Sequence, residues 1–149
     1  MNKGFTIVEI LITMAIAVIL IGFTTFSLLG LRFQTAMNTT VNSLSTDLRT
    51  QQLLTMTGEA TTGAGIYFMT DSYVLFSGPA YNPASGANLT VRLNGGLVIS
   101  QTSFPSQAIL FAPGSGEATQ AGTITIEDQA NHEGKTFSIN KLGTVTDVL

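Results

Sequence analysis

The residues of this chain that are best suited to chemistry lie near its start, in the segment Gly-Phe-Thr-Ile-Val-Glu from Gly4 to Glu9. Glu9 places a carboxylate at the edge of a long uncharged run that begins with Ile10. A carboxylate is costly to bury in hydrocarbon, so one at this position is expected to have a functional partner. The junction between Glu9 and Ile10 is therefore the first candidate site.

The uncharged run extends from Ile10 to Leu31, which is 22 residues. A helix of this length crosses a bilayer core of roughly 30 Å. A secretory signal peptide would have a shorter apolar stretch that ends in a small-residue cleavage site, and neither is present. A single-pass anchor explains the length and the flanking cations Lys3 and Arg32, of which Lys3 weakly favours a cytoplasmic N-terminus. An ordinary anchor does not explain Glu9.

The segment resembles the class III signal of type IV pilins and type II secretion pseudopilins. In that family a prepilin peptidase cuts after the Gly of a short basic leader, the new N-terminal residue is methylated, and a Glu stands at the fifth mature position. The resemblance implies a leader of residues 1–4, cleavage between Gly4 and Phe5, and N-methylation of Phe5. It also implies that Glu9 pairs with the N-terminal amine of a neighbouring subunit during assembly, since unpaired charges are costly in a low dielectric.

The helix is expected to continue past the uncharged run. Phe33, Met37, Val41, Leu44 and Leu48 recur at the spacing of one apolar helix stripe, and Gly58 is a stop signal. We therefore predict a helix from Phe5 to about Thr57, with a transmembrane and assembly half (5–31) and an amphipathic half (32–57). The stripe is expected to pack on the chain's own sheet rather than in a partner's groove.

Residues 58–149 are expected to form a β-rich globular domain, because short β-like runs alternate with Gly, Pro, Asn and Asp. One hairpin is predicted from 66–69 and 73–76. A second is predicted from 89–93 and 97–100 across Asn94-Gly95-Gly96. Further strands are expected at 108–111, 123–127, 136–140 and 144–148. The fold class is α+β, a long N-terminal helix packed on an antiparallel β-sheet domain, as in pilins.

The C-terminal pattern is also similar to the minor pilins and pseudopilins called GspH or FimT-like. The segments that carry this likeness are strand-like runs around glycines: Ile109–Phe111, Gly114–Gly116, Gly122–Ile126, Phe137–Ile139 and Lys141–Val145.

Residues for catalysis or metal binding are scarce. There is no cysteine and one histidine, His132, in a polar turn, so a catalytic triad or zinc site has almost nothing to use. Asp128, Asn131 and Glu133 do not have the spacing of an EF-hand loop. We expect no enzymatic activity, no metal and no cofactor.

The sequence thus favours a structural function: a minor pilin or pseudopilin of a type IV pilus or type II secretion pseudopilus. The resemblance implies as partners other pilins, the prepilin peptidase, membrane lipid, and an inner-membrane assembly platform with its ATPase. It implies a bacterial inner-membrane protein with a cytoplasmic N-terminus and an external C-terminal domain, which later enters a filament.

Two alternatives remain open at this stage. One is a DNA-capturing pilin, which some FimT-like proteins are thought to be. The stretch from Lys141 to Asp147 offers one Lys, one Asp and no Arg, and the residues after Arg32 carry eight acidic and four basic side chains. A net negative domain disfavours DNA binding. The other alternative is an unprocessed single-pass adhesin.

Overall fold

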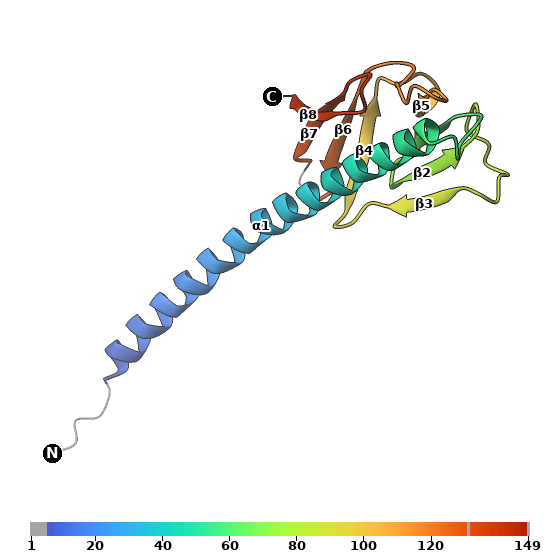
Figure 1. Cartoon of the computed structure of the whole chain (residues 1–149). Coiled ribbons are helices and arrows are strands. Elements are labelled where there is room, and N and C mark those ends of the chain that lie inside the picture. Colours follow the sequence, from blue (N-terminus) through green and yellow to red (C-terminus); the bar gives the residue numbers. More distant parts are fainter. Residues whose placement is uncertain (1–5, 131, 149) are drawn as a thin grey trace. The chain divides into compact units, whose positions relative to one another are not determined.

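The computed structural model describes residues 6–130 and 132–148, without the side chains of residues 23–33, 147 and 148. The chain divides into two compact units, Met1–Thr35 and Ala36–Leu149. The first unit holds the start of the only α-helix among the described residues, and the second holds the rest of that helix and all of the described strands (Figure 1).

The helix α1 runs from Ile7 to Met56 and contains 50 residues. No proline interrupts it, so the backbone hydrogen-bond ladder can continue throughout. At its C-terminal end the Thr57 N–H donates to the Leu53 carbonyl at 2.8 Å, and Gly58 then takes a φ of +81°, which ends the helix. The predicted helix and its stop at Gly58 are confirmed over the described residues.

In the second unit, α1 buries one stripe. Met37, Leu44 and Leu48 are each at most 1% exposed, as the sequence pattern predicted, whereas Val41 is only partly buried. Polar side chains continue the stripe toward the end of the helix, where Gln51 and Thr55 are buried. This part of α1 packs on the chain's own sheets, so the preference for an internal partner is confirmed.

Among the described residues, eight strands form two antiparallel sheets of four strands each. The first sheet has the order β3-β2-β1-β5 and the second has the order β4-β6-β7-β8. Part of α1 lies beside both sheets (Figure 1). The predicted α+β class is confirmed, with two sheets in the globular unit. The strand bounds are β1 Ala64–Phe68, β2 Ser72–Ser77, β3 Leu89–Arg92, β4 Leu97–Thr102, β5 Ala108–Phe111, β6 Gly122–Asp128, β7 Gly134–Ile139 and β8 Val145–Val148, with a short 3-10 helix η1 at Pro105–Gln107.

The first predicted hairpin is confirmed, but the second is wrong. β1 and β2 pair in antiparallel register, whereas β3 and β4 belong to different sheets. β3 pairs with β2 and β4 pairs with β6, so Asn94-Gly95-Gly96 connects the two sheets. The physical reason is burial: Leu97 and Ile99 of β4 are 3% and 8% exposed, and pairing with β6 places them in the core. Pairing with β3 would instead extend the first sheet beyond a strand that is mostly exposed.

A buried polar contact joins the helix to the first sheet. The Tyr73 hydroxyl on β2 donates to Oδ2 of Asp47 on α1 at 2.6 Å, and Tyr73 is 1% exposed. Burial, with the hydrogen bond to the Asp47 carboxylate and its negative charge, raises the pKa of Tyr73 well above its usual value. The neutral hydroxyl is therefore the form that the folded protein requires.

This contact predicts a specific loss of stability in alkali. In the unfolded chain Tyr73 ionises near pH 10, whereas in the folded protein it stays protonated to higher pH. The contribution to stability is therefore complete below about pH 10 and falls by up to about 1.4 kcal/mol per pH unit above it. Denaturant unfolding of the full chain in detergent, from pH 8 to pH 11, measures this slope.

Tyr73→Phe is the informative variant, because it removes the hydroxyl and keeps the ring. At pH 8 it should lower the free energy of unfolding by about 1.5–3 kcal/mol, and this difference from the natural chain should shrink above pH 10. Tyr67→Phe is the matched control and should keep the alkaline slope. A slope unchanged in Tyr73→Phe would contradict the assignment.

Candidate functional site

The first turn of α1 is closed by a reciprocal pair of hydrogen bonds between Thr6 and Glu9. The Thr6 N–H donates to Glu9 Oε2 at 3.0 Å, and the Glu9 N–H donates to Thr6 Oγ1 at 3.3 Å. The Thr6 hydroxyl also donates to Glu9 Oε2 at 3.0 Å. This is a capping box, in which the first residue before a helix and the third residue inside it satisfy each other's backbone donors.

The cap gives Glu9 a local structural role that the sequence analysis missed. The signal was present, because Thr6 and Glu9 have the Thr-x-x-Glu spacing of a capping box. The bonds that the Glu9 carboxylate accepts from described residues both go to Oε2. Among those residues nothing bonds Oε1, so the same carboxylate can hold its own helix start and accept a bond from another chain. Capping and assembly are thus compatible roles for Glu9.

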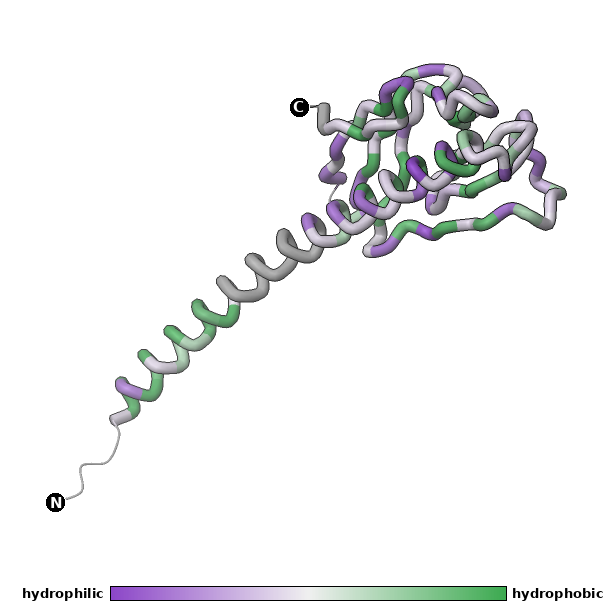
Figure 2. The backbone as a smooth tube through the Cα atoms, viewed as in Figure 1, coloured by the Kyte–Doolittle hydropathy of each residue, from purple (hydrophilic) through white to green (hydrophobic). Residues whose placement is uncertain are grey.

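The described part of α1 in the first unit is mostly apolar, as the green stretch of the tube shows (Figure 2), and its apolar positions occur on every side of the helix. They are between 49% and 79% exposed: Ile7, Val8, Ile10, Leu11, Ile12, Met14, Ile16, Val18, Ile19, Leu20 and Ile21. The hydroxyl of Thr13 is satisfied within the helix, since it donates to the carbonyls of Glu9 and Ile10, both at 2.9 Å. A helix that is apolar all round is suited to apolar surroundings, in lipid or among other helices.

The predicted site residues are only partly within the described chain. Gly4 and Phe5, the expected cleavage and methylation positions, lie outside the described residues. Ile10, the expected start of the membrane segment, is in α1 and 49% exposed. Leu31, its expected end, is in the backbone of α1, but its side chain is outside the described set. Among the described residues, no helix combines the length and the hydropathy that crossing a membrane requires.

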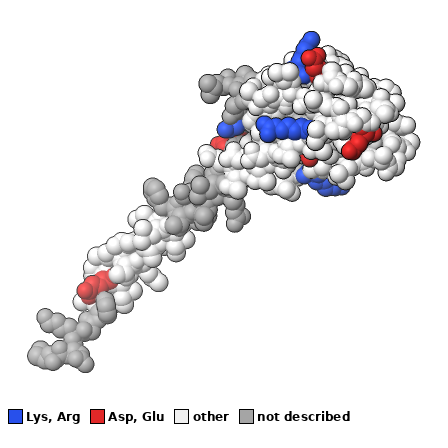
Figure 3. Space-filling model, in the orientation of Figure 1, with Lys and Arg blue, Asp and Glu red and all other residues white. Residues whose placement is uncertain are grey.

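In the globular unit, the chemistry considered from the sequence centres on His132 and the polar residues near it. His132 is exposed with a φ of +57°, and within residues 6–130 and 132–148 no cluster of His, Cys, Asp or Glu could hold a metal ion. Asn131 lies outside the described residues. On the face drawn in Figure 3, basic side chains are interspersed with acidic and neutral ones. This face shows no continuous basic surface for DNA.

The similarity of this chain to known proteins lies in the first unit. Residues 1–25 match the family model described as the prokaryotic N-terminal methylation motif. The chain has a pilin-type N-terminus. No curated protein and no solved structure matches the chain.

A pilin-type N-terminus is the methylation motif of type IV pilins and type II secretion pseudopilins. It implies processing by a prepilin peptidase, partners in a filament, and a location in a membrane or a filament. It is the motif of structural proteins rather than of enzymes. The matched residues contain the whole capping box, so the Thr6–Glu9 cap lies inside the pilin-type N-terminus.

The cap predicts that Thr6→Ala frays the start of α1. Replacing a Thr N-cap by Ala costs about 0.5–2 kcal/mol of helix stability, so the Glu9 amide should exchange with solvent roughly 2- to 30-fold faster. Hydrogen exchange of the full chain in detergent micelles measures this rate. Thr13→Ala is the matched control, because its hydroxyl bonds only helix carbonyls. Equal exchange in Thr6→Ala and the natural chain would disprove the cap.

Proposed function

We propose that this chain is a minor pilin or pseudopilin, a structural subunit that joins or primes a type IV pilus or a type II secretion pseudopilus. The observation that carries the proposal is the pilin-type N-terminus followed by a helix that is apolar on every described side. The GspH and FimT-like likeness of the C-terminal segments supports the minor subgroup. Before assembly the subunit is held in the inner membrane, with its C-terminal domain outside.

The proposed organisation follows the chemistry of the sequence. Residues 1–4 are the leader, 5–31 form the membrane and assembly half of the helix, 32–57 form its amphipathic half, and 58–149 form the globular domain. Residues 10–31 lack any charge and are long enough to span the bilayer core. The described apolar side chains would contact lipid before assembly and the helices of neighbouring subunits afterwards. One apolar surface therefore suits both states.

Glu9 is the proposed assembly residue. After cleavage, Phe5 would carry an α-ammonium at the membrane boundary, and the Glu9 carboxylate of an incoming subunit would neutralise that of a neighbour. A charge pair in a low dielectric is strongly weakened when one partner is removed. Because the cap uses Oε2, Oε1 receives no bond from the described residues and could accept one from the neighbour's amine.

Processing is the first expected outcome of this proposal. Coexpression with a prepilin peptidase should yield a chain that lacks Met1 to Gly4 and carries one N-methyl group on Phe5, as measured by intact mass. Gly4→Val should remain full length, because a side chain at the scissile residue blocks close approach of the peptidase. Gly22→Ala is the control, since an added Cβ there meets no described atom within 4 Å. An unprocessed natural chain would favour the adhesin alternative.

Incorporation into filaments separates the charge of Glu9 from its capping role. Glu9→Gln should be processed normally but depleted by more than about tenfold from sheared filaments or isolated pseudopili, because the ammonium loses its counter-charge. Glu59→Gln, on the exposed turn after α1, is the charge control and should assemble normally. Thr6→Ala keeps the carboxylate and should also assemble. Gln can also complete a capping box, so normal assembly of Glu9→Gln would contradict the role of the charge, whereas loss of Thr6→Ala as well would show that the cap is needed in addition.

A further inference from the structure

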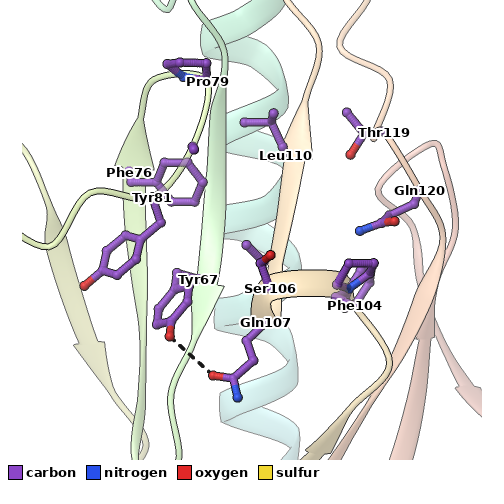
Figure 4. Close-up of a pocket in the computed structure, with 13 residues that line it drawn as sticks. Tyr67, Phe76, Pro79, Tyr81, Phe104, Ser106, Gln107, Leu110, Thr119 and Gln120 are labelled. Atoms are coloured by element: carbon purple, nitrogen blue, oxygen red, sulfur yellow. Dashed lines mark hydrogen bonds between the residues drawn. The ribbon is translucent and has the colours of Figure 1, made fainter.

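A hollow on the globular unit lies on the face of the first sheet that points away from α1 (Figure 4). Its volume is about 920 Å³, within the range of pockets that hold small organic ligands. Leu110 and Ala108 of the edge strand β5 form part of its lining, between the loop after β2 on one side and η1 with residues 119–120 on the other (Figure 4). We refer to this hollow as the outer groove.

One wall of the outer groove is aromatic. The rings of Tyr67 and Tyr81 stack with their centroids 4.0 Å apart and an angle of 11° between planes, and Phe76 meets Tyr81 edge-on at 5.8 Å. Phe76 is buried, whereas both tyrosines are partly exposed. Gly65 makes this arrangement possible, because an added Cβ there would lie 2.9 Å from the Phe76 ring. The result is a stack of two rings in which each ring covers one face of the other, and the parts that stay exposed line the groove.

The opposite wall carries neutral hydrogen-bonding groups. Ser106, Gln107, Thr119 and Gln120 contribute two hydroxyls and two amides, and none of the residues that line the groove is charged. The Tyr67 hydroxyl donates to Gln107 Oε1 at 3.3 Å. This bond uses the amide oxygen, so the Nε2 group of Gln107 remains as the donor for a ligand. Figure 4 shows the Gln120 amide directed from its wall toward the middle of the groove.

Both walls are held in place by local backbone structure. Ser106 and Gln107 each have a φ of +54°, a left-handed conformation that is uncommon for residues other than glycine and persists only where the surroundings impose it. The loop that carries Tyr81 is braced at Asn82, whose carbonyl accepts bonds from the Ser85 N–H at 3.1 Å and from Asn88 Nδ2 at 2.8 Å. A preformed site loses less entropy when a ligand binds.

The composition of the groove selects among classes of occupant. A charged ligand would find no counter-charge in the lining, and a hydrocarbon would bury the hydroxyls and amides without partners, which is costly. A peptide cannot add as a strand to β5, because a bridge between Phe111 and Ala118 and a bond from the Thr119 N–H to the Leu110 carbonyl at 2.9 Å already cover that edge. An uncharged ligand with one apolar face and many hydroxyls satisfies every part of the groove.

We propose that the outer groove binds a neutral oligosaccharide. The C–H face of a sugar ring would lie against the exposed outer face of the Tyr67–Tyr81 stack, and its hydroxyls would bond the amides of Gln107 and Gln120. A second hollow of about 470 Å³ shares Gln107 with the first, and it too is lined by no charged residue. Its polar lining, which includes Thr70, Ser100 and Thr102, would take further sugar units. This inference concerns the globular unit and does not depend on the proposed assembly function.

The test uses the absence of tryptophan from the chain, which leaves tyrosine as the emitter. The full chain, in a detergent without a sugar headgroup, is titrated with short neutral oligosaccharides of glucose, galactose, mannose and N-acetylglucosamine while tyrosine emission is recorded. Two of the three tyrosines line the groove, so a bound sugar should give a saturable change. An acidic oligogalacturonate and an oligoproline peptide serve as competitor classes and should give none.

The binding variants replace glutamines that are exposed or partly exposed, so the protein should still fold when they are changed. Gln107→Ala and Gln120→Ala should each weaken binding roughly fivefold, the value of one hydrogen bond, with unchanged circular dichroism. Gln129→Ala, an exposed glutamine in the turn after β6, should bind like the natural chain. The proposal is overturned if no neutral saccharide gives a saturable change, if both groove variants bind normally, or if oligoproline binds with the same dependence on Gln107.

Discussion

Removal of apolar surface from water is the constraint on which the rest of this molecule depends, and α1 meets it in two ways. In the globular unit the helix buries one stripe, around Met37, Leu44 and Leu48, against the chain's own sheets. In the first unit the described apolar side chains surround the helix and are exposed. A continuous helix with both surfaces is consistent with a subunit whose globular core is complete and whose first half is completed by lipid or by other chains.

Several polar groups on α1 that lie in apolar surroundings are satisfied by hydrogen bonds within the chain. Thr6 and Glu9 satisfy each other at the start of the helix, and the Thr13 hydroxyl is satisfied by helix carbonyls. In apolar surroundings such internal bonds matter more than in water, because no solvent replaces them. Asp47 is likewise bonded where it meets the core, by the buried hydroxyl of Tyr73. The two contacts fix the beginning of α1 and its place on the first sheet.

The globular unit combines a well-packed core with a neutral polar surface. Charged residues are 10% of the chain, and the outer groove carries none of them. Aromatic side chains that might have joined the core instead form one wall of this groove, where Tyr67 and Tyr81 stack. Their position follows from the alternation of the strand: Ile66 and Phe68 point to the core, so Tyr67 between them points to the outer face. The loop after β2 then brings Tyr81 against it.

Patterns of neighbouring residues were sufficient to predict the elements that depend on contacts between residues close in sequence. The spacing of apolar residues predicted α1, glycine predicted its end, and the β1–β2 hairpin was recognised because its strands pair across three residues. The Thr-x-x-Glu spacing also contained the capping box, although it was not recognised. The same segment, in residues 1–25, carried the pilin-type motif. These features depend on neighbours in sequence, so the sequence by itself determined them.

Contacts between distant segments were decided only by the tertiary structure. Asn94-Gly95-Gly96 permits a hairpin, but burial of Leu97 and Ile99 beside β6 is more favourable, so β4 joins the second sheet. The Asp47–Tyr73 bond joins residues 26 positions apart, and the outer groove joins four separate segments of the chain. Turn propensity contributes less free energy than burial of apolar side chains in a shared core. The pairing of strands and the groove therefore follow from global packing, which local patterns do not encode.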